Sequence, residues 1–158
     1  MRKLNLGCGN DIRREDGIEW VNLDSSDEVK ADIVEDFATT YPWPFQDGEF
    51  DEVVANNSLT QILNNDDFIN VMHELWRVTK PNGVIKIRVP YALHECAWQD
   101  PMDSRRFTPE SFTYMEAGHR RYEQYGKHYG FPPFHVKLVE NNGIQMHFEL
   151  IPCIVRPE

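Results

Sequence analysis

The sequence has few cysteines, no long apolar run and a deficit of basic residues. Its three cysteines, Cys8, Cys96 and Cys153, form no CxxC pair. This excludes a disulfide framework or a zinc knuckle and favours a reducing compartment. No apolar run approaches the roughly 18 residues of a membrane span, and the chain opens on a strand-like segment rather than on a signal peptide. We therefore expect a cytoplasmic protein without membrane contact.

The charge balance argues against a nucleic-acid partner. The chain carries 16 basic and 26 acidic residues, for a net charge of −10, whereas a binder of phosphate backbones normally shows a basic footprint. The charge is also uneven. Residues 1–75 hold 5 basic and 17 acidic side chains, and residues 76–158 hold 11 and 9. An anionic ligand is therefore expected near the second half.

The length of 158 residues allows one domain, residues 1–158. Strand patterns alternate with helix patterns, which predicts an α/β sheet. A helix over 66–79 follows from an apolar stripe at helical spacing, with Asn65 as its N-cap and the turn at 81–83 as its end. We expect strands at five places before and after it: 3–6, 18–23, 32–35, 50–55 and 84–89.

The last third of the chain contains a second helix signal and a hairpin signal. Thr108, Pro109 and Glu110 form a helix start, and this helix is expected to run to about residue 117. Residues 119–134, rich in Tyr, Gly and Pro, are interpreted as a long loop. Strands at 136–140 and 144–151 flank an Asn-Gly turn, which predicts an antiparallel hairpin.

A glycine turn follows the first expected strand. Gly7 and Gly9 allow the backbone to turn tightly and to approach a ligand closely, and Asp24 closes the next strand 15 residues after Gly9. A carboxylate there can accept hydrogen bonds from both hydroxyls of an adenosine ribose. The same glycines also suit an ordinary turn. A dinucleotide fingerprint would need a third glycine where Ile12 stands, so a nicotinamide-dependent oxidoreductase is the weaker alternative.

Five segments in order resemble the class I S-adenosylmethionine-dependent methyltransferases, in their short type-11-like branch. They are LNLGCG at 4–9, WVNLD at 20–24, VEDF at 34–37, FDEVVANNSL at 50–59 and ELWRVTKPNGVIKIRVP at 74–90. The resemblance implies a Rossmann-like, doubly wound sheet of seven strands with the last two forming an antiparallel hairpin. The family's N-terminal helices are truncated in this sequence, and the gap from Gly7 to Ile18 is short for a crossover helix. We therefore expect an open pocket, which a second copy in a homo-oligomer or a partner chain could cover.

The resemblance also implies a set of residues that bind the cofactor, S-adenosylmethionine. Five would wrap its methionine part: Leu6, Gly7, Cys8, Gly9 and Asn10. Asp24 would hold the ribose hydroxyls, Asp36 would accept from the adenine amine, and Phe37 would pack against the adenine ring. Asn56 and Ser58 would line the pocket beside the sulfonium. Taken alone, Asp36 also fits a solvated loop acid, and Asn56 and Ser58 also fit turn caps.

The acceptor side is expected in the loop after the fifth strand, which faces the methyl-transfer region in this family. The stretch at 100–109 resembles a family segment that normally carries a histidine where this chain has Asp103. Asp103 and His94 are the candidates for a general base, and Tyr91, Arg105 and Arg106 are the candidates for substrate binding. The two arginines also fit a solvated pair before a helix. Together with Arg120, Arg121 and Lys127 they suggest an acceptor with a carboxylate or phosphate.

The sequence thus predicts a transferase that moves a methyl group from S-adenosylmethionine to an oxygen or nitrogen of a small-molecule acceptor. Its histidines lack the spacing of metal ligands, so no metal is expected. The alternative is a catalytically silent, S-adenosylmethionine-binding subunit that a partner chain completes.

Overall fold

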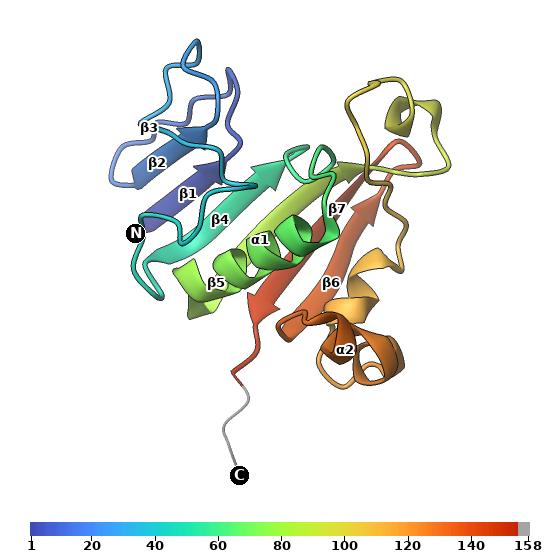
Figure 1. Cartoon of the computed structure of the whole chain (residues 1–158). Coiled ribbons are helices and arrows are strands. Elements are labelled where there is room, and N and C mark those ends of the chain that lie inside the picture. Colours follow the sequence, from blue (N-terminus) through green and yellow to red (C-terminus); the bar gives the residue numbers. More distant parts are fainter. Residues whose placement is uncertain (155–158) are drawn as a thin grey trace.

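The computed structural model describes residues 1–154, and its seven strands form one mixed sheet in the order β3-β2-β1-β4-β5-β7-β6 (Figure 1). The strands are β1 (Arg2–Leu6), β2 (Glu19–Asp24), β3 (Ile33–Val34), β4 (Phe50–Asn56), β5 (Thr79–Pro90), β6 (Phe134–Asn141) and β7 (Gln145–Pro152). The first five pair in parallel, and β7 pairs antiparallel with both β5 and β6. The predicted seven-stranded α/β sheet with its closing hairpin is confirmed.

The helix predicted from the apolar stripe is confirmed as α1 (Asn65–Val78). The prediction of its cap was wrong by one residue. Asn64 is the N-cap, and its side-chain oxygen accepts the N–H groups of Asp66 at 2.8 Å and of Asp67 at 3.2 Å. Asn64 has extended backbone angles, as an N-cap requires, whereas Asn65 already belongs to the helix.

Three further expectations are corrected. The turn at 81–83 lies within β5, which starts at Thr79 and shifts register between its pairings to Phe50 and Glu52. The helix expected to reach 117 is only the 3-10 segment η2 (Ser111–Met115), because the chain then turns to form a bridge to Phe134. The segment 119–134 is not one loop, since its middle forms helical turns between Gly118 and Gly130, both with positive φ. Those turns are the π-helix η3 (Tyr122–Gly126) and α2 (Lys127–Tyr129).

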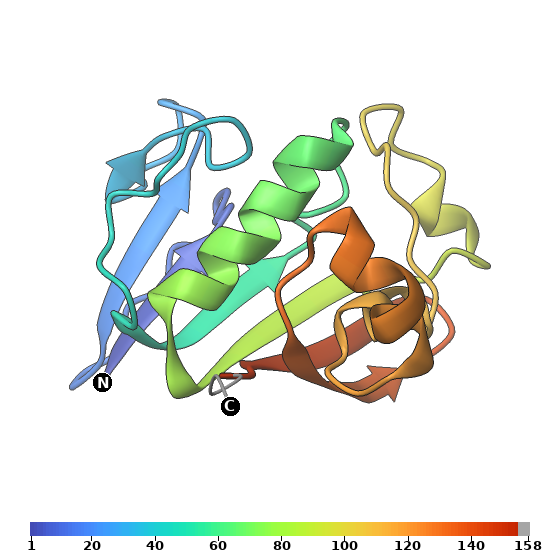
Figure 2. The same ribbon diagram turned by 60° about the horizontal axis from the view of Figure 1, so that its bottom comes forward.

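One face of the sheet is apolar and carries the helices. α1 and α2 lie on the same side of the sheet in both views (Figures 1 and 2). The core forms where apolar strand residues meet α1: Leu4, Leu23, Val53, Ile85 and Phe148 from the sheet, and Phe68, Val71, Met72 and Leu75 from α1. Burial of this stripe is the main stabilising contribution to α1, at about 1.5–3 kcal/mol for each fully buried side chain.

The opposite face of the sheet is polar. Lys3, Glu52 and Lys86 form a chain of ion pairs across β1, β4 and β5, with N–O distances of 3.3 and 3.1 Å. The crossover from β1 to β2, residues 7–18, contains no helix, which agrees with the short gap seen in the sequence. No helix in residues 1–154 has the length and apolar character needed to cross a membrane.

Candidate cofactor-binding site

A cavity opens at the carboxyl ends of β1, β2 and β4. The strand order reverses between β1 and β4, and ligands of open α/β sheets bind at such a switch point. The cavity has a volume of about 540 Å³. Its lining comes from the ends of these strands, from the segment after β3 and from the start of α1: Gly7, Asp24, Ser25, Asp36, Phe37, Ala38, Thr39, Asn57, Ser58, Gln61, Ile62, Leu63, Asn64 and Asp67.

The glycine turn after β1 forms one wall of the cavity. Gly7 and Gly9 have φ values of +63° and +50°, which side chains adopt only under strain. A Cβ on Gly7 would lie 2.5 Å from the Cβ of Ser58 and 3.3 Å from the ring of Phe37. A Cβ on Gly9 would meet nothing within 4 Å. Only Gly7 is therefore required by close packing as well as by backbone conformation.

Asp24 ends β2 and presents its carboxylate to the cavity. One carboxylate oxygen accepts the N–H of Gly9 at 2.8 Å, and the other accepts the N–H of Ser26 at 2.9 Å. These bonds fix the orientation of the side chain and tie the β1 and β2 loops together. Each oxygen keeps a further lone pair for a ligand, so the carboxylate can still receive two hydroxyl groups.

Asp36 and Phe37 follow β3 on the far side of the cavity. The Asp36 carboxylate accepts the N–H of Ala38 at 3.0 Å and the hydroxyl of Thr39 at 2.8 Å. The Phe37 ring packs edge-on against Trp43, whose indole N–H donates to the Phe37 carbonyl at 2.9 Å. This arrangement gives the cavity a rigid aromatic wall beside a carboxylate.

Ser58 supplies a polar group that lacks a partner. Its Oγ is buried and forms no hydrogen bond with any other described residue. A buried hydroxyl without a partner has lost its hydrogen bonds to water with no replacement, which costs about 1–3 kcal/mol. Because Ser58 lines the cavity, a polar ligand atom there would satisfy it.

The last residue of β4 and the residue that follows it line different cavities. Asn56 lines a small cavity of about 100 Å³ on the polar face, beside Arg88 and His147. Its neighbour Asn57, with a φ of +52°, faces the cofactor cavity instead. The sequence pattern missed Asn57, although the Asn-Asn-Ser turn after a strand was the signal that could have revealed it. Leu6, Cys8, Gly9 and Asn10 also do not line the cavity.

Cys8 lies beneath the glycine turn and is 5% exposed. Burial, together with the negative charge of Asp24, raises the pKa of its thiol to about 11. Cys8 is therefore a neutral, packed side chain at physiological pH, and its backbone N–H donates to the Leu23 carbonyl at 3.0 Å.

The loop after β5 is tied to the segment after β4. The hydroxyl of Thr60 donates to Asp103 at 2.7 Å, and the N–H groups of Ser104 and Arg105 donate to the Thr60 carbonyl at 2.8 and 2.9 Å. Asp103 thus lies beside the segment that contributes Gln61 to the cavity, although it does not line the cavity itself.

The other acceptor-side candidates, Tyr91, His94 and Arg106, do not line the cavity either. His94 Nδ1 accepts the N–H of Cys96 at 3.1 Å and caps the 3-10 segment η1 (Glu95–Ala97). The Tyr91 N–H donates to the Ile144 carbonyl, and the Arg106 guanidinium lies 4.4 Å from the centre of the Trp98 ring.

Of the remaining basic candidates, Arg121 and Lys127 form ion pairs, whereas Arg105 is bonded to backbone carbonyls. Arg105 does not line the cofactor cavity, but it donates to the carbonyls of Ile62 and Asn64 in the loop before α1, and these two residues do line it. Arg121 pairs with Glu110, and Lys127 pairs with Glu123. The last two charges are therefore already neutralised within the protein.

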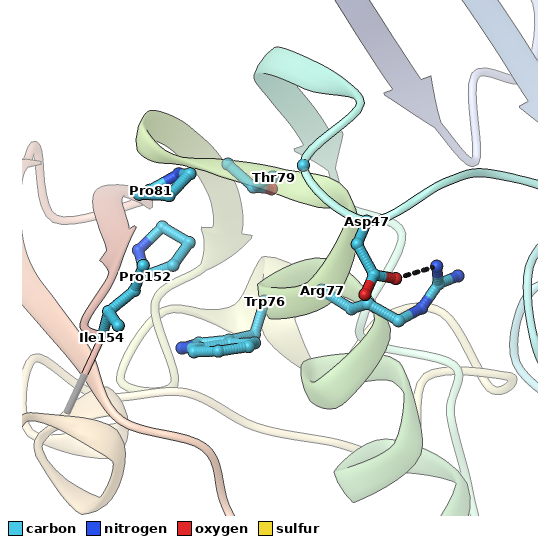
Figure 3. Close-up of a pocket in the computed structure, with 8 residues that line it drawn as sticks. Asp47, Trp76, Arg77, Thr79, Pro81, Pro152 and Ile154 are labelled. Carbon is cyan, nitrogen blue, oxygen red and sulfur yellow. Dashed lines mark hydrogen bonds and ion pairs between the residues drawn. The ribbon is translucent and has the colours of Figure 1, made fainter. Parts of the chain in front are cut away.

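A further cavity, of about 270 Å³, lies at the other end of the strands, where β5 begins and β7 ends (Figure 3). Trp76, Thr79, Pro81 and Pro152 surround it, and the ion pair between Arg77 and Asp47 lies beside it. It holds none of the predicted site residues. Within residues 1–154, no three His, Cys, Asp or Glu side chains are grouped so that they could hold a metal ion.

The family model described as a methyltransferase domain matches residues 4–87, which include the glycine turn, Asp24, Asp36 and all of α1. The chain belongs to this family of class I S-adenosylmethionine-dependent methyltransferases. No curated protein matched the sequence.

Solved structures share the fold at low sequence identity. An S-adenosylmethionine-dependent methyltransferase of Archaeoglobus fulgidus aligns with a TM-score of 0.63 and 20% identity, over 88% of this chain and 64% of that one. The complex of DhpI with SAM and HEP gives 0.64 and 16%, over 96% and 78%. A complex between the Trm112 methyltransferase activator of Haloferax volcanii and a methyltransferase gives 0.61 and 18%, over 96% and 83%.

Proposed function

We propose that this protein binds S-adenosylmethionine and transfers its methyl group to an oxygen or nitrogen of a small-molecule acceptor. The observation that carries the proposal is the meeting of Gly7, Asp24, Asp36, Phe37 and Ser58 around one cavity. These five residues come from four separate segments of the chain. The family resemblance had assigned each of them to the same ligand.

The residues present fit this cofactor. Gly7 leaves a space that a Cβ would fill, and Ser58 offers an unpartnered hydroxyl. Asp24 would accept from the ribose hydroxyls, and Asp36 would accept from the adenine amine beside the ring of Phe37. When bound, the cofactor supplies an already electrophilic methyl group on its sulfonium. The protein's own contribution is then chiefly alignment of the acceptor and exclusion of water.

The acceptor would enter from the loop after β5. Asp103, held by Thr60 beside the cavity, is our first candidate for a general base if the acceptor arrives protonated. His94 is the second, and its Nδ1 is occupied by a backbone N–H. Tyr91 and Arg106 would contact the acceptor, and the Arg106 Nε is buried with no hydrogen-bond partner among residues 1–154. The three free cysteines support a reducing, cytoplasmic location.

Calorimetry with S-adenosylhomocysteine tests the cofactor assignment. We expect Asp24→Ala to weaken binding by about 2–3 kcal/mol, since hydrogen bonds to a charged group are lost. The matched control is Asp27→Ala, which removes an exposed acid from the same loop and should leave the affinity unchanged. Equal affinities for the parent and Asp24→Ala would refute the role of Asp24.

A catalytically silent subunit is the second candidate. Three apolar side chains are strongly exposed, namely Leu63 of the cavity lining at 81%, and Leu93 and Met102 of the loop after β5 at 81% and 71%. Exposed apolar groups of this kind are typical of surfaces that bind another chain. The isolated protein would then bind S-adenosylhomocysteine yet transfer no methyl group to any member of a broad acceptor panel. Transfer to one acceptor would exclude this candidate.

A further inference from the structure

A second cleft lies on the helical face of the sheet, between α1 and the chain from 104 to 131. It consists of two adjoining cavities of about 490 and 400 Å³. The two share Phe68, Arg105, Tyr129 and Phe131, and no residue that lines either one lines the cofactor cavity. The volumes fall in the range of small-molecule sites.

Aromatic rings form most of the cleft. Phe107 stacks on Phe112 with centroids 5.5 Å apart, and Phe68 meets Phe131 edge-on at 5.9 Å. Phe68, Phe107 and Phe112 are almost fully buried and make an apolar floor. Tyr129, 54% exposed, stands at the rim. A flat apolar ligand could place one face on these rings and the other against Tyr129.

The side of the cleft formed by Tyr114 and Tyr129 depends on a close backbone contact. A Cβ built on Gly126 would lie 1.7 Å from the carbonyl oxygen of Tyr114, so only glycine lets the π-helix η3 lie directly on η2. This contact brings the Tyr114 and Tyr129 rings into a stacked arrangement with centroids 6.4 Å apart. π-Helical turns are frequent at functional sites.

Arg105 brings a charge to this aromatic cleft without an internal counterion. Its guanidinium lies 4.2 Å from the centre of the Phe68 ring. Nε donates to the Ile62 carbonyl at 2.5 Å, and Nη2 donates to the Asn64 carbonyl and the Asn65 side chain at 3.1 and 2.9 Å. Nη1 takes part in none of these hydrogen bonds, and within residues 1–154 no carboxylate lies within ion-pair distance of Arg105.

The physical consequence is a preference for an anion. A partly buried cation whose partners are neutral oxygens is incompletely compensated, and burial accordingly lowers the pKa of Arg105. A carboxylate on the free Nη1 would add a charge-assisted hydrogen bond.

We propose that this cleft is a second binding site, for a small planar aromatic ligand that bears one carboxylate. The ring of the ligand packs between the phenylalanine floor and Tyr129, and its carboxylate accepts from Nη1 of Arg105. The site is separate from the cofactor cavity, because the segment 62–65 that Arg105 holds stands between them. The proposal does not depend on methyl transfer.

Binding of 2-naphthoate, measured by calorimetry and compared with the neutral analogue 2-naphthalenemethanol, tests the proposal on the full chain. We expect the carboxylate to bind about tenfold more tightly than the alcohol, as a charge-assisted hydrogen bond provides. Equal affinities, or no binding of either compound, would overturn the proposal. Saturation with S-adenosylhomocysteine should leave the 2-naphthoate affinity unchanged, and displacement would also overturn it, since the probe would then occupy the cofactor cavity.

Substitutions in the cleft test whether 2-naphthoate binds there. Tyr129→Ala should weaken 2-naphthoate binding about fivefold through the lost aromatic contact. His128→Ala is the matched control, since His128 is exposed beside Tyr129 in α2 but lines neither cavity of the cleft. Arg105→Gln should abolish the preference for the carboxylate over the alcohol. If that variant fails to fold, the comparison of Tyr129→Ala with His128→Ala still decides the question, and equal losses in both would refute the proposed site. Failure of S-adenosylhomocysteine to bind would count against the methyltransferase proposal alone.

Discussion

At the scale of single residues, two glycines in one turn have different reasons to be glycine. Gly7 and Gly9 both have positive φ, so a side chain at either costs about 1–2 kcal/mol of strain. At Gly7 the added Cβ would also collide with Ser58, while at Gly9 it would meet open space. Glycine is therefore required at position 7 by the packing around the cofactor cavity as well as by the turn, and at position 9 by the turn alone.

This difference predicts distinct effects on ligand binding. Gly7→Ala should weaken S-adenosylhomocysteine binding about tenfold or more, because overpacking of about 1–3 kcal/mol displaces Ser58 and Phe37 from the cavity wall. Gly9→Ala should leave the affinity nearly unchanged. Calorimetry measures both, and thermal melting checks that the two variants are comparably stable. Equal affinities in two folded variants would show that Gly7 does not shape the ligand site.

At the scale of elements, α1 is anchored by a partly buried ion pair. The residues Glu74 and Arg77 are three apart on the helix, and Arg77 donates to both carboxylate oxygens of Glu74, at 2.9 and 2.6 Å. Glu74 also accepts the N–H of Trp43 at 2.7 Å, and Arg77 donates to the Phe45 carbonyl at 2.7 Å. The pair thus fixes the long crossover between β3 and β4 to the end of the helix.

Replacement of Glu74 should therefore cost more than a surface ion pair does. We expect Glu74→Gln to lower the free energy of unfolding by about 2–3 kcal/mol, because Arg77 and the Trp43 N–H lose a charged partner. The matched control is Glu123→Gln, in the exposed pair between Glu123 and Lys127, which should change stability very little. Urea denaturation of the two variants measures the difference. Similar losses would show that burial adds nothing to the Glu74 pair.

Elements with a regular hydrophobic period were predictable from the sequence, and elements fixed by tertiary contacts were not. The stripe from Phe68 to Trp76 predicted α1, and the Asn-Gly turn predicted the β6–β7 hairpin. The π-helix η3 was missed because Gly126 suggests a loop until its contact with the Tyr114 carbonyl is known.

The same limit applies to the candidate site. The strand pattern placed Gly7 and Asp24 at the ends of neighbouring strands, the family resemblance added Asp36, and the sheet brings all three to one cavity. Asn56 was assigned to the cavity by the family resemblance, as a residue following a strand expected to end at residue 55. In the structure β4 continues to Asn56, and the alternation of strand side chains then sends this residue to the other face. One residue of strand length decides which asparagine meets the cavity.

At the scale of the whole molecule, the corner formed by the crossover at 7–18 and the ends of β1 and β2 is held by polar contacts rather than by a helix. The crossover at 7–18 packs on the buried amides of Asn5 and Asn22, and the Asn22 side-chain oxygen accepts from Asn5 and from the Arg13 N–H. Asp32 closes the network: it accepts from the N–H and the side chain of Asn22 and forms two bonds with Arg14. This corner carries the β1 and β2 ends that shape the cofactor cavity.

The corner should therefore lose stability in acid. Although burial opposes it, hydrogen bonding from Asn22 and Arg14 lowers the pKa of Asp32 below its usual 3.8. A depressed native pKa gives stability that is present above the unfolded value and lost as pH falls through the native one. We expect Asp32→Asn to cost about 1 kcal/mol at pH 7, since the pair is partly solvent-screened, and to cost progressively less below pH 3.8. Urea denaturation across pH, with exposed Asp27→Asn as the control, measures this, and amide exchange at Asn22 should accelerate in acid before exchange in β4. A pH-independent cost of Asp32→Asn would contradict the role of the ionised carboxylate in holding this corner.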